Sequence, residues 1–195
     1  MIKYDSFIIV ENEHLYGPGK RLVLFMQGCS LRCPGCVNEH LWDFSEGKKI
    51  SITNLVGLCH DLDGITLHGG EPLDQSEELL TLVKKLKEDK KTIILFTGYK
   101  FKELEVYSQK QVWKLSDIVI SGRYIKEKRN IYLQYRGSSN QRIFKHKGKY
   151  KNYKIKDGFT AGIITLTNDG KMTSLGFQND DLENLIIELE TNISE

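Results

Sequence analysis

Residues 22–36 read Leu22-Val23-Leu24-Phe25-Met26-Gln27-Gly28-Cys29-Ser30-Leu31-Arg32-Cys33-Pro34-Gly35-Cys36, a continuous apolar run that leads into a loop with three cysteines. An apolar run without alternation is expected of a strand buried on both faces of a parallel sheet. The cysteines follow with C-x3-C-x2-C spacing. Three thiolates in a short loop can reach three irons of one cubane cluster, which leaves the fourth iron open for a small molecule.

Two other kinds of metal site fit the same three cysteines. A structural zinc site would use them with Cys59 or a histidine, although structural zinc normally takes two paired sets of ligands. A plain electron-transfer cluster would take Cys59 as its fourth ligand. Cys59 lies on the apolar side of a helix predicted over residues 51–60, where a buried free cysteine is common. The spacing therefore leaves these alternatives open.

Strand and helix patterns alternate from residue 22 to residue 120. After a short first strand at residues 8–10, strands are predicted over residues 22–26, 65–67, 92–96 and 118–120, and helices over 51–60, about 75–89 and 101–109. This alternation is typical of parallel strands joined by right-handed crossovers. Asp74 is predicted to cap the second helix, with Glu77 three residues on.

The alternation stops after residue 122. Residues 123–158 are polar, basic and aromatic. A hairpin is predicted beyond them, from strands at residues 163–166 and 172–177 around Asn168-Asp169-Gly170, with a closing helix over residues 181–189. We therefore expect a core of residues 1–122 and a C-terminal part, residues 123–195, that completes the same domain.

Charge is distributed unevenly along the 195 residues. Residues 123–156 hold twelve Lys or Arg and one acid, Glu127, for a net charge of +11, whereas the remainder carries −9 and the whole chain +2. Such asymmetry can mark a surface for an anionic partner or substrate. No stretch approaches the roughly 18 apolar residues of a membrane span. The N-terminus does not resemble a signal peptide, so we expect a cytoplasmic protein with no membrane contact.

The cysteine loop, placed after the first long buried strand, resembles that of the radical S-adenosylmethionine superfamily. Gly69-Gly70-Glu71-Pro72, at the end of the next predicted strand, matches the G-G-E-P motif of that superfamily. There, this strand end binds the amino group of the methionine moiety. The resemblance implies an α/β fold, a partial (β/α)6 TIM-like barrel open on one side, with its site at the C-terminal ends of the strands.

A closer resemblance, from about residue 2 to residue 177, is to the activating enzymes of anaerobic ribonucleotide reductases. The matching features are Gly17-Pro18-Gly19-Lys20-Arg21, Gln27-Gly28-Cys29, the Cys33-Pro34-Gly35-Cys36 exit, Asn38, Trp42, Thr97-Gly98-Tyr99, Asp117-Ile118-Val119-Ile120 and the motif at residues 136–142. Two positions depart from the pattern. Gly35 stands where many superfamily members carry an aromatic residue that packs near the adenine. Ser121-Gly122 stands where the activating enzymes often have Asp-Gly.

This resemblance implies a [4Fe–4S] cluster held by Cys29, Cys33 and Cys36, with S-adenosylmethionine bound beside it. The residues implied to bind S-adenosylmethionine are Gly35, Gly69, Gly70, Glu71, Pro72, Thr97 and Gly98. Flavodoxin or ferredoxin would reduce the cluster. Because the cofactors carry the difficult step, we assign no acid–base residue.

Several charged and titratable residues remain as weaker candidates. Among His40, His60 and His68, His68 is preferred because it adjoins the Gly-Gly-Glu turn. Arg136 and Arg142 are candidates for binding a carboxylate or phosphate through two hydrogen bonds.

Three functions follow from these features. The first is an activating enzyme that installs a glycyl radical on a large partner, an anaerobic ribonucleotide reductase. The second is a small-molecule enzyme, similar to 7-carboxy-7-deazaguanine synthase, that acts on a purine-like or phosphorylated substrate. The third is a binding module that uses the cluster for structure. A nucleic-acid partner is not expected.

Overall fold

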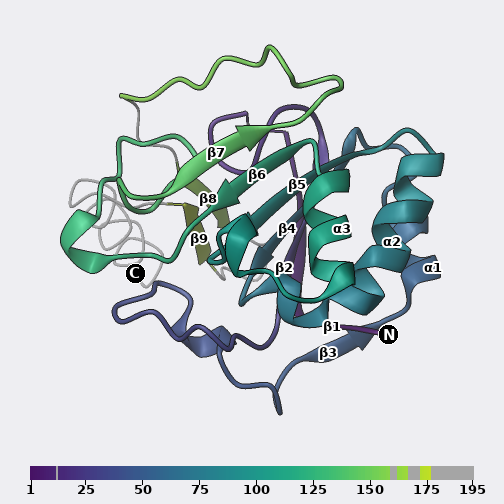
Figure 1. Ribbon diagram of the computed structural model, residues 1–195, viewed down its shortest axis with the longest axis horizontal. Helices are drawn as coiled ribbons and strands as arrows, with labels where there is room; N and C mark the ends of the chain where they lie inside the picture. Colours follow the sequence, from purple (N-terminus) through teal and green to yellow (C-terminus); the bar gives the residue numbers. More distant parts are fainter. Residues whose placement is uncertain (12, 159–161, 167–171, 177–195) are drawn as a thin grey trace.

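The computed structural model describes residues 1–11, 13–158, 162–166 and 172–176. The main sheet has seven strands in the order β3-β1-β2-β4-β5-β6-β7 (Figure 1). They are β1 (Ile2–Val10), β2 (Arg21–Met26), β3 (Lys48–Ile50), β4 (Gly64–Gly69), β5 (Thr92–Thr97), β6 (Ile118–Ser121) and β7 (Arg142–Lys145). Strands β2, β4, β5 and β6 are parallel, whereas β1, β3 and β7 pair antiparallel with their neighbours. The chain is an α/β protein with a mixed sheet and a parallel centre.

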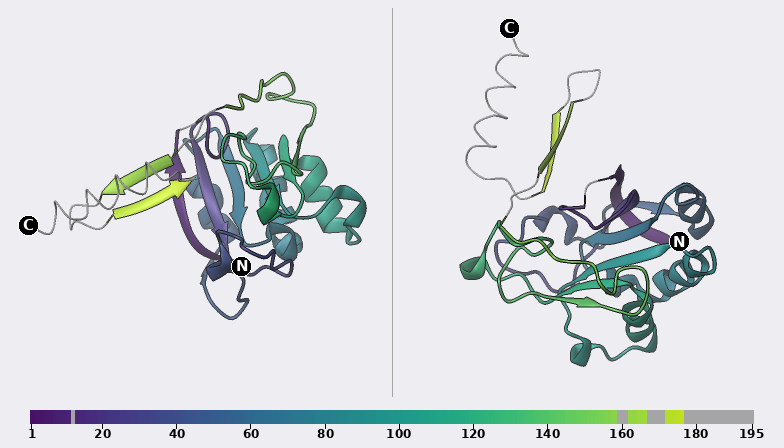
Figure 2. Two further views of the ribbon diagram at one scale, coloured as in Figure 1. Left: turned by 90° about the vertical axis from the view of Figure 1, so that its left-hand side faces the viewer. Right: turned by 90° about the horizontal axis from the view of Figure 1, so that it is seen from above.

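Among the described residues, three helices cover one face of this sheet (Figures 1 and 2). They are α1 (Ile52–Leu58), α2 (Ser76–Glu88) and α3 (Tyr107–Leu115). α2 and α3 each connect two neighbouring parallel strands, and α1 lies in the connection from β2 to β4, after β3. This arrangement confirms the predicted alternation. Leu22, Leu24 and Met26 of β2 point to the helix face and join the main hydrophobic core. Short 3-10 helices are found at η1 (Glu39–Leu41), η2 (Pro72–Gln75), η3 (Phe101–Glu103) and η4 (Lys126–Lys128).

Loops rather than helices cover the opposite face, here called the inner face. Val23 and Phe25 pack there with Tyr16, and Ile120 packs with Tyr135. This explains why every residue of β2 is buried. A strand covered on both faces needs a continuous apolar run rather than an alternating one.

One end of the inner face is closed by Arg21, which is fully buried. Its guanidinium donates to the hydroxyl of Thr66 at 2.8 Å and to the carbonyl oxygen of Pro18. Neutral acceptors thus satisfy a buried cation, and desolvation lowers the pKa of Arg21. Arg21 begins β2, so this network lies at the opposite end of the sheet from the cysteine loop.

The basic stretch of residues 123–156 crosses the inner face and is fastened to the core. Lys149 pairs with Asp63 at 2.7 Å, and Lys156 pairs with Glu13 at 2.8 Å. The buried Tyr150 hydroxyl donates to the Pro18 carbonyl oxygen at 3.0 Å. These contacts span more than eighty residues of sequence, and they account for the position of the stretch without any partner.

Some predicted elements are wrong in their boundaries. The third helix begins at Tyr107, not at residue 101, because Leu104 is buried in an extended conformation between η3 and α3. Gln109 then accepts the Val106 N–H at 3.3 Å and starts the helix. Asp74 does not cap α2, whose N-cap is Gln75.

Two strands were not predicted, and part of the C-terminal prediction is confirmed. β3 and β7 are short, contain basic residues and form by pairing at the two edges of the sheet. The predicted hairpin is present as β8 (Gly162–Leu166) and β9 (Met172–Gly176), which pair antiparallel in a separate sheet (Figure 2). The predicted turn at residues 168–170 and the helix at 181–189 lie outside the described residues. Among the described helices, none has the length and apolar character needed to cross a bilayer.

Candidate functional site

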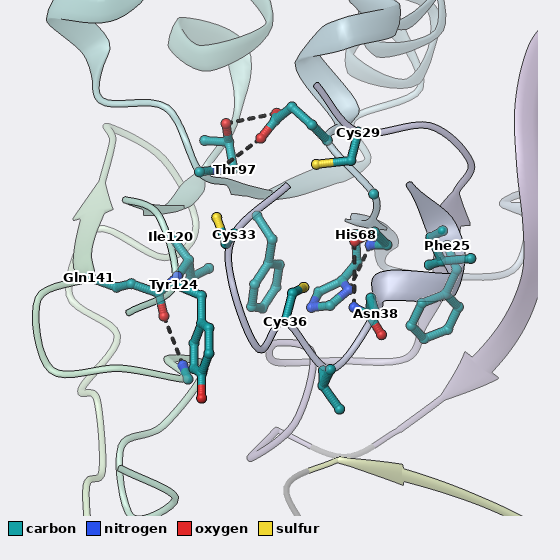
Figure 3. A pocket seen from close by; sticks show the side chains of 18 of the residues that line it. Phe25, Cys29, Cys33, Cys36, Asn38, His68, Thr97, Ile120, Tyr124 and Gln141 are labelled. Carbon is teal, nitrogen blue, oxygen red and sulfur yellow. Dashed lines mark hydrogen bonds between the residues drawn. The ribbon is translucent and has the colours of Figure 1, made fainter. Parts of the chain in front are cut away.

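A cavity of about 760 Å³ lies at the C-terminal ends of β2, β4, β5 and β6 (Figure 3). This volume falls in the usual range for small-ligand pockets. Nine of the ten predicted site residues line it: Cys29, Cys33, Gly35, Cys36, Gly69, Gly70, Glu71, Thr97 and Gly98. Pro72 does not line it, because it is buried as the first residue of η2. Parallel strands bring these distant segments to one edge of the sheet, as the strand pattern predicted.

The cysteine loop is held in place by backbone hydrogen bonds. The N–H groups of Gly28 and Cys29 donate to the carbonyl oxygens of Leu41 and Trp42, at 2.8 and 3.2 Å. A tight turn brings the Cys36 N–H to within 3.1 Å of the Cys33 carbonyl oxygen. In Figure 3 the three sulfurs border the cavity from different points of the loop.

The surroundings of Cys29 and Cys36 act on their thiols in two opposed ways. Desolvation raises the pKa of both thiols. The backbone N–H groups of Leu31 and Arg32 oppose this at Cys29, and that of Asn38 opposes it at Cys36. In the free protein these thiols are therefore protonated. The same N–H groups are suited to bond thiolate sulfurs once iron has displaced the protons.

Glu71 connects the ends of two neighbouring strands. Its buried carboxylate accepts hydrogen bonds from the Thr97 hydroxyl and the Gly98 N–H, both at 2.8 Å, and from the Leu73 N–H at 2.9 Å. Desolvation raises the pKa of Glu71 to about 7, against the lowering effect of these bonds. Glu71 thus joins the Gly-Gly-Glu-Pro turn to the Thr97-Gly98 turn and fixes the shape of the pocket wall.

The glycines of this wall allow backbone segments to touch. A Cβ on Gly70 would lie closer than 3.0 Å to the Gly28 carbonyl oxygen, and one on Gly69 would overlap the Met26 backbone. Gly69 also has a positive φ of 101°, which other residues rarely adopt. A Cβ on Gly35 would meet the Lys126 side chain. The stem of Lys126 therefore occupies the space beside Gly35, which lacks the aromatic side chain found in many superfamily members.

Comparison with known proteins gives one family. Residues 15–144 match the model of the 4Fe-4S single cluster domain. The anaerobic ribonucleoside-triphosphate reductase-activating protein of Enterobacteria phage T4 is 37% identical over 152 residues, covering 73% of this chain and 94% of the phage protein. The protein of the same name from Escherichia coli K12 is 35% identical over 136 residues, covering 64% and 88% of the two chains.

The chain belongs to the family of these activating proteins. It is a radical S-adenosylmethionine protein with a 4Fe–4S cluster, which confirms the resemblance noted from the cysteine loop and the Gly-Gly-Glu-Pro turn. Among solved structures, QueE from Escherichia coli matches with a TM-score of 0.43 and 16% identity, over 60% of this chain and 68% of that one. That similarity is too low to bear on the function of this family member.

Cys59 does not fit as the fourth ligand in either of the alternative metal sites. Cys59 is fully buried in the core beside the N-terminal end of β4, and burial raises its pKa to about 11. The cysteine loop lies at the other end of β4, about 17 Å away at roughly 3.3 Å per residue.

Asp74 supports the site from outside the cavity, and the sequence did not reveal this role. Its carboxylate accepts from the N–H and the hydroxyl of Ser30, at 2.7 and 2.9 Å, and Ser30 directly follows Cys29. The Tyr99 hydroxyl contacts the Ser30 hydroxyl at 3.0 Å and the Asp74 carboxylate at 3.4 Å. Asp74 therefore fastens the cysteine loop to the ends of β4 and β5. The role was not predicted because the position of Asp74 before a helix suggested a helix cap instead.

The weaker candidates divide between the pocket and the surface. His40 and His68 line the pocket, whereas His60 is exposed and bonded to Asp61. Arg136 donates to both oxygens of Asp157, at 2.7 and 2.6 Å.

The motif at residues 136–142 reaches the pocket through Gln141 rather than through its arginines. The Gln141 side chain accepts from the Gly137 N–H at 2.8 Å and donates to the Gly122 carbonyl oxygen at 2.9 Å. Arg142 lies exposed on β7. Gln141 therefore fastens this motif to the end of β6, on the side of the pocket where Tyr124 lies (Figure 3).

Proposed function

We propose that this chain activates an anaerobic ribonucleoside-triphosphate reductase, as the names of its relatives indicate, and that it does so by installing a glycyl radical on that enzyme. One observation carries the proposal. In a chain of this family, one pocket is bordered on one side by three cysteine sulfurs and on the other by the Gly-Gly-Glu and Thr-Gly strand ends. We infer that Cys29, Cys33 and Cys36 each hold one iron of the cluster. The fourth iron is then free of protein ligands.

The wall of the pocket is suited to the methionine end of S-adenosylmethionine. Gly69 and Gly70 permit close approach of a ligand to the backbone, and strand-end carbonyls there can accept from an ammonium group. Glu71 is bonded to Thr97 and Gly98, so it positions this wall. When bound, the cluster and S-adenosylmethionine would supply the reductive cleavage of S-adenosylmethionine and the radical chemistry that removes a hydrogen atom from glycine. The chain's own residues hold these groups and exclude water.

We propose that a large partner completes the site. We propose that the sheet is the partial (β/α)6 TIM-like barrel of the superfamily, although three helical crossovers, not six, are found among the described residues. Residues 123–158 pack against the inner face, which supports our proposal that they complete the same domain as residues 1–122. We further propose a cytoplasmic location, with flavodoxin or ferredoxin as electron donor.

The small-molecule alternative is less well supported. It would use the basic residues 123–156 to bind a phosphate, with Arg136 and Arg142 as candidates for that contact. Arg136 is paired with Asp157, and Lys149 and Lys156 are paired with Asp63 and Glu13. These cations are engaged within the chain.

The test uses protein purified without oxygen, with its cluster reconstituted and reduced. S-adenosylmethionine and the candidate reductase are added, and 5′-deoxyadenosine and the glycyl radical signal are measured. Both products are expected. Cys29→Ala, Cys33→Ala and Cys36→Ala should abolish both, whereas Cys59→Ala serves as the matched control and should retain them.

The two measurements distinguish two ways in which the proposal can be wrong. Deoxyadenosine without a glycyl radical would refute the proposed partner and direct attention to small substrates. Bound iron without cleavage under any reductant would mean that the cluster is structural.

A further inference from the structure

His68 forms part of the floor of the pocket, below the cysteine loop. It lies near the C-terminal end of β4, on the inner face, and its ring projects into the cavity (Figure 3). Aromatic rings surround it: the ring centroids of Phe96, Phe25 and Tyr16 lie 4.5, 5.6 and 5.6 Å from that of His68. An imidazole is thus the polar group in an otherwise apolar part of the floor.

The geometry fixes the tautomer of this imidazole. Nδ1 of His68 accepts the Gly69 N–H at 2.7 Å, so the ring proton must lie on Nε2. Burial lowers the pKa of His68 to about 4, which keeps the ring neutral at physiological pH. Among the described residues, no hydrogen bond to Nε2 is formed, and Nε2 is not among the buried polar atoms that lack a partner. Nε2 therefore presents a fixed N–H to the cavity.

We propose that His68 is a positioning residue whose Nε2–H donates to an uncharged oxygen of the molecule bound in the pocket. The aromatic surroundings disfavour a charged acceptor, because they cannot solvate it. A donor held in one tautomer by the backbone, in a ring locked by three aromatic neighbours, is suited to orient a ligand.

This inference rests on the proposed function, in which two bound molecules carry such an oxygen. One is S-adenosylmethionine, through a ribose hydroxyl, and the other is the glycine segment of the partner, through a backbone carbonyl. Loss of the hydrogen bond should weaken or misdirect that molecule about tenfold.

The experiment compares His68→Phe with His68→Gln in the reconstituted holoenzyme. Phe keeps a ring of similar size and removes the donor, whereas Gln can restore an N–H donor. His60→Gln is the control, because His60 is exposed and bonded to its neighbour Asp61. Three quantities are measured: the dissociation constant of S-adenosylmethionine, the ratio of deoxyadenosine to glycyl radical, and the electron paramagnetic resonance spectrum of the reduced cluster.

Two results support the proposal and identify the acceptor. If affinity for S-adenosylmethionine falls about tenfold in His68→Phe, the acceptor is the ribose. If affinity is unchanged but the ratio of deoxyadenosine to glycyl radical rises about tenfold, it is the glycine segment. In either case His68→Gln should recover most of the loss, and the spectrum without S-adenosylmethionine should match that of the wild type.

Other results overturn the proposal. If His68→Phe matches the wild type in both quantities, or if His68→Phe and His68→Gln lose activity to the same extent, the N–H has no positioning role. If His68→Phe does not load its cluster, His68→Met replaces it, since Met and Gln have similar length and differ in the donor. Failure of the proposed function is separate, because it would be seen in the wild type as an absence of the glycyl radical.

Discussion

Replacing Asp74 should loosen the cysteine loop without unfolding the protein. In the structure, Asp74 accepts two hydrogen bonds from Ser30 and a longer one from Tyr99. A hydrogen bond to an ionised acceptor contributes about 1.5–3 kcal/mol when it is shielded from water. Ser30 is exposed and Asp74 is half-buried, so we take about 2 kcal/mol for the whole contact in Asp74→Ala. That energy corresponds to a roughly 30-fold rise in the population of the open loop.

The assay is the rate at which a strong iron chelator removes the cluster from the anaerobic holoenzyme. If the loop opens before iron is captured, this rate follows the open population and should rise between about ten- and thirtyfold in Asp74→Ala. Ser30→Ala removes the hydroxyl and keeps the N–H contact, so its effect should be smaller. Asp61→Ala is the control, because its carboxylate is exposed and bonded to the adjacent His60.

A chelation rate in Asp74→Ala within a factor of two of the wild type would refute this reasoning. So would an equal acceleration in Asp61→Ala, which would point to a general effect of charge. Urea unfolding of the iron-free protein distinguishes local opening of the cysteine loop from a loss of global stability. Its midpoint should change little, because the contact fastens a surface loop and lies outside the hydrophobic core.

Three further predictions test other parts of the site. In a urea titration, Gly70→Ala should lower the free energy of unfolding by about 2–3 kcal/mol, because its Cβ would overlap the Gly28 carbonyl oxygen. Gly57→Ala is the matched control, because the space around its Cβ is open. It should be neutral or slightly stabilising in the same titration. The pKa of Glu71 is about 7 in the folded protein, against an ordinary 4.5, so its contribution to stability is complete below pH 4.5 and is lost as the pH rises through 7. The free energy of unfolding of the wild type should therefore fall by on the order of 3 kcal/mol between pH 5 and pH 8, and Glu71→Gln should not show this fall. A pH profile of Glu71→Gln that matches the wild type would contradict this. The pKa of Cys59 is about 11, against an ordinary 9.0, which implies about a hundredfold less thiolate in the folded protein. Iodoacetamide should therefore modify Cys59 at least a hundredfold more slowly in the folded iron-free protein than in the unfolded chain. Comparable rates would show that the thiol is accessible.

The parallel centre of the sheet and the position of the pocket could be predicted from the sequence because the signals are local. Buried strands such as β2 need a continuous apolar run, and parallel strands must end at one edge. A motif at each strand end therefore predicts a shared site. Nine of the ten predicted residues meet at that edge for this reason. The tenth, Pro72, belongs to the same motif but serves to start η2.

The contacts that support the site could not be predicted, because they join residues distant in sequence. Asp74 has the residue type and position of a helix cap, yet its carboxylate is used by Ser30, 44 residues earlier. β7 is too short for its sequence pattern to predict a strand, and it forms by pairing with β6 at the edge of the sheet. The start of α3 was predicted too early because Leu104 is a buried apolar residue, as expected in a helix. Its backbone is extended instead, between η3 and α3.

The uneven charge of the chain has an internal explanation that composition did not suggest. Four cations of the basic stretch pair with carboxylates that lie outside it: Arg123 with Glu103, Arg136 with Asp157, Lys149 with Asp63, and Lys156 with Glu13. Each pair is at least partly exposed, so each contributes about 1 kcal/mol or less. Burial of Tyr135 and Tyr150 against the inner face contributes more. The aromatic residues therefore contribute most of the stability of this stretch on the core, while the ion pairs determine which surface of the core it contacts. Lys126, whose stem covers Gly35 at the edge of the pocket, is a cation of this stretch that remains placed to meet a bound molecule.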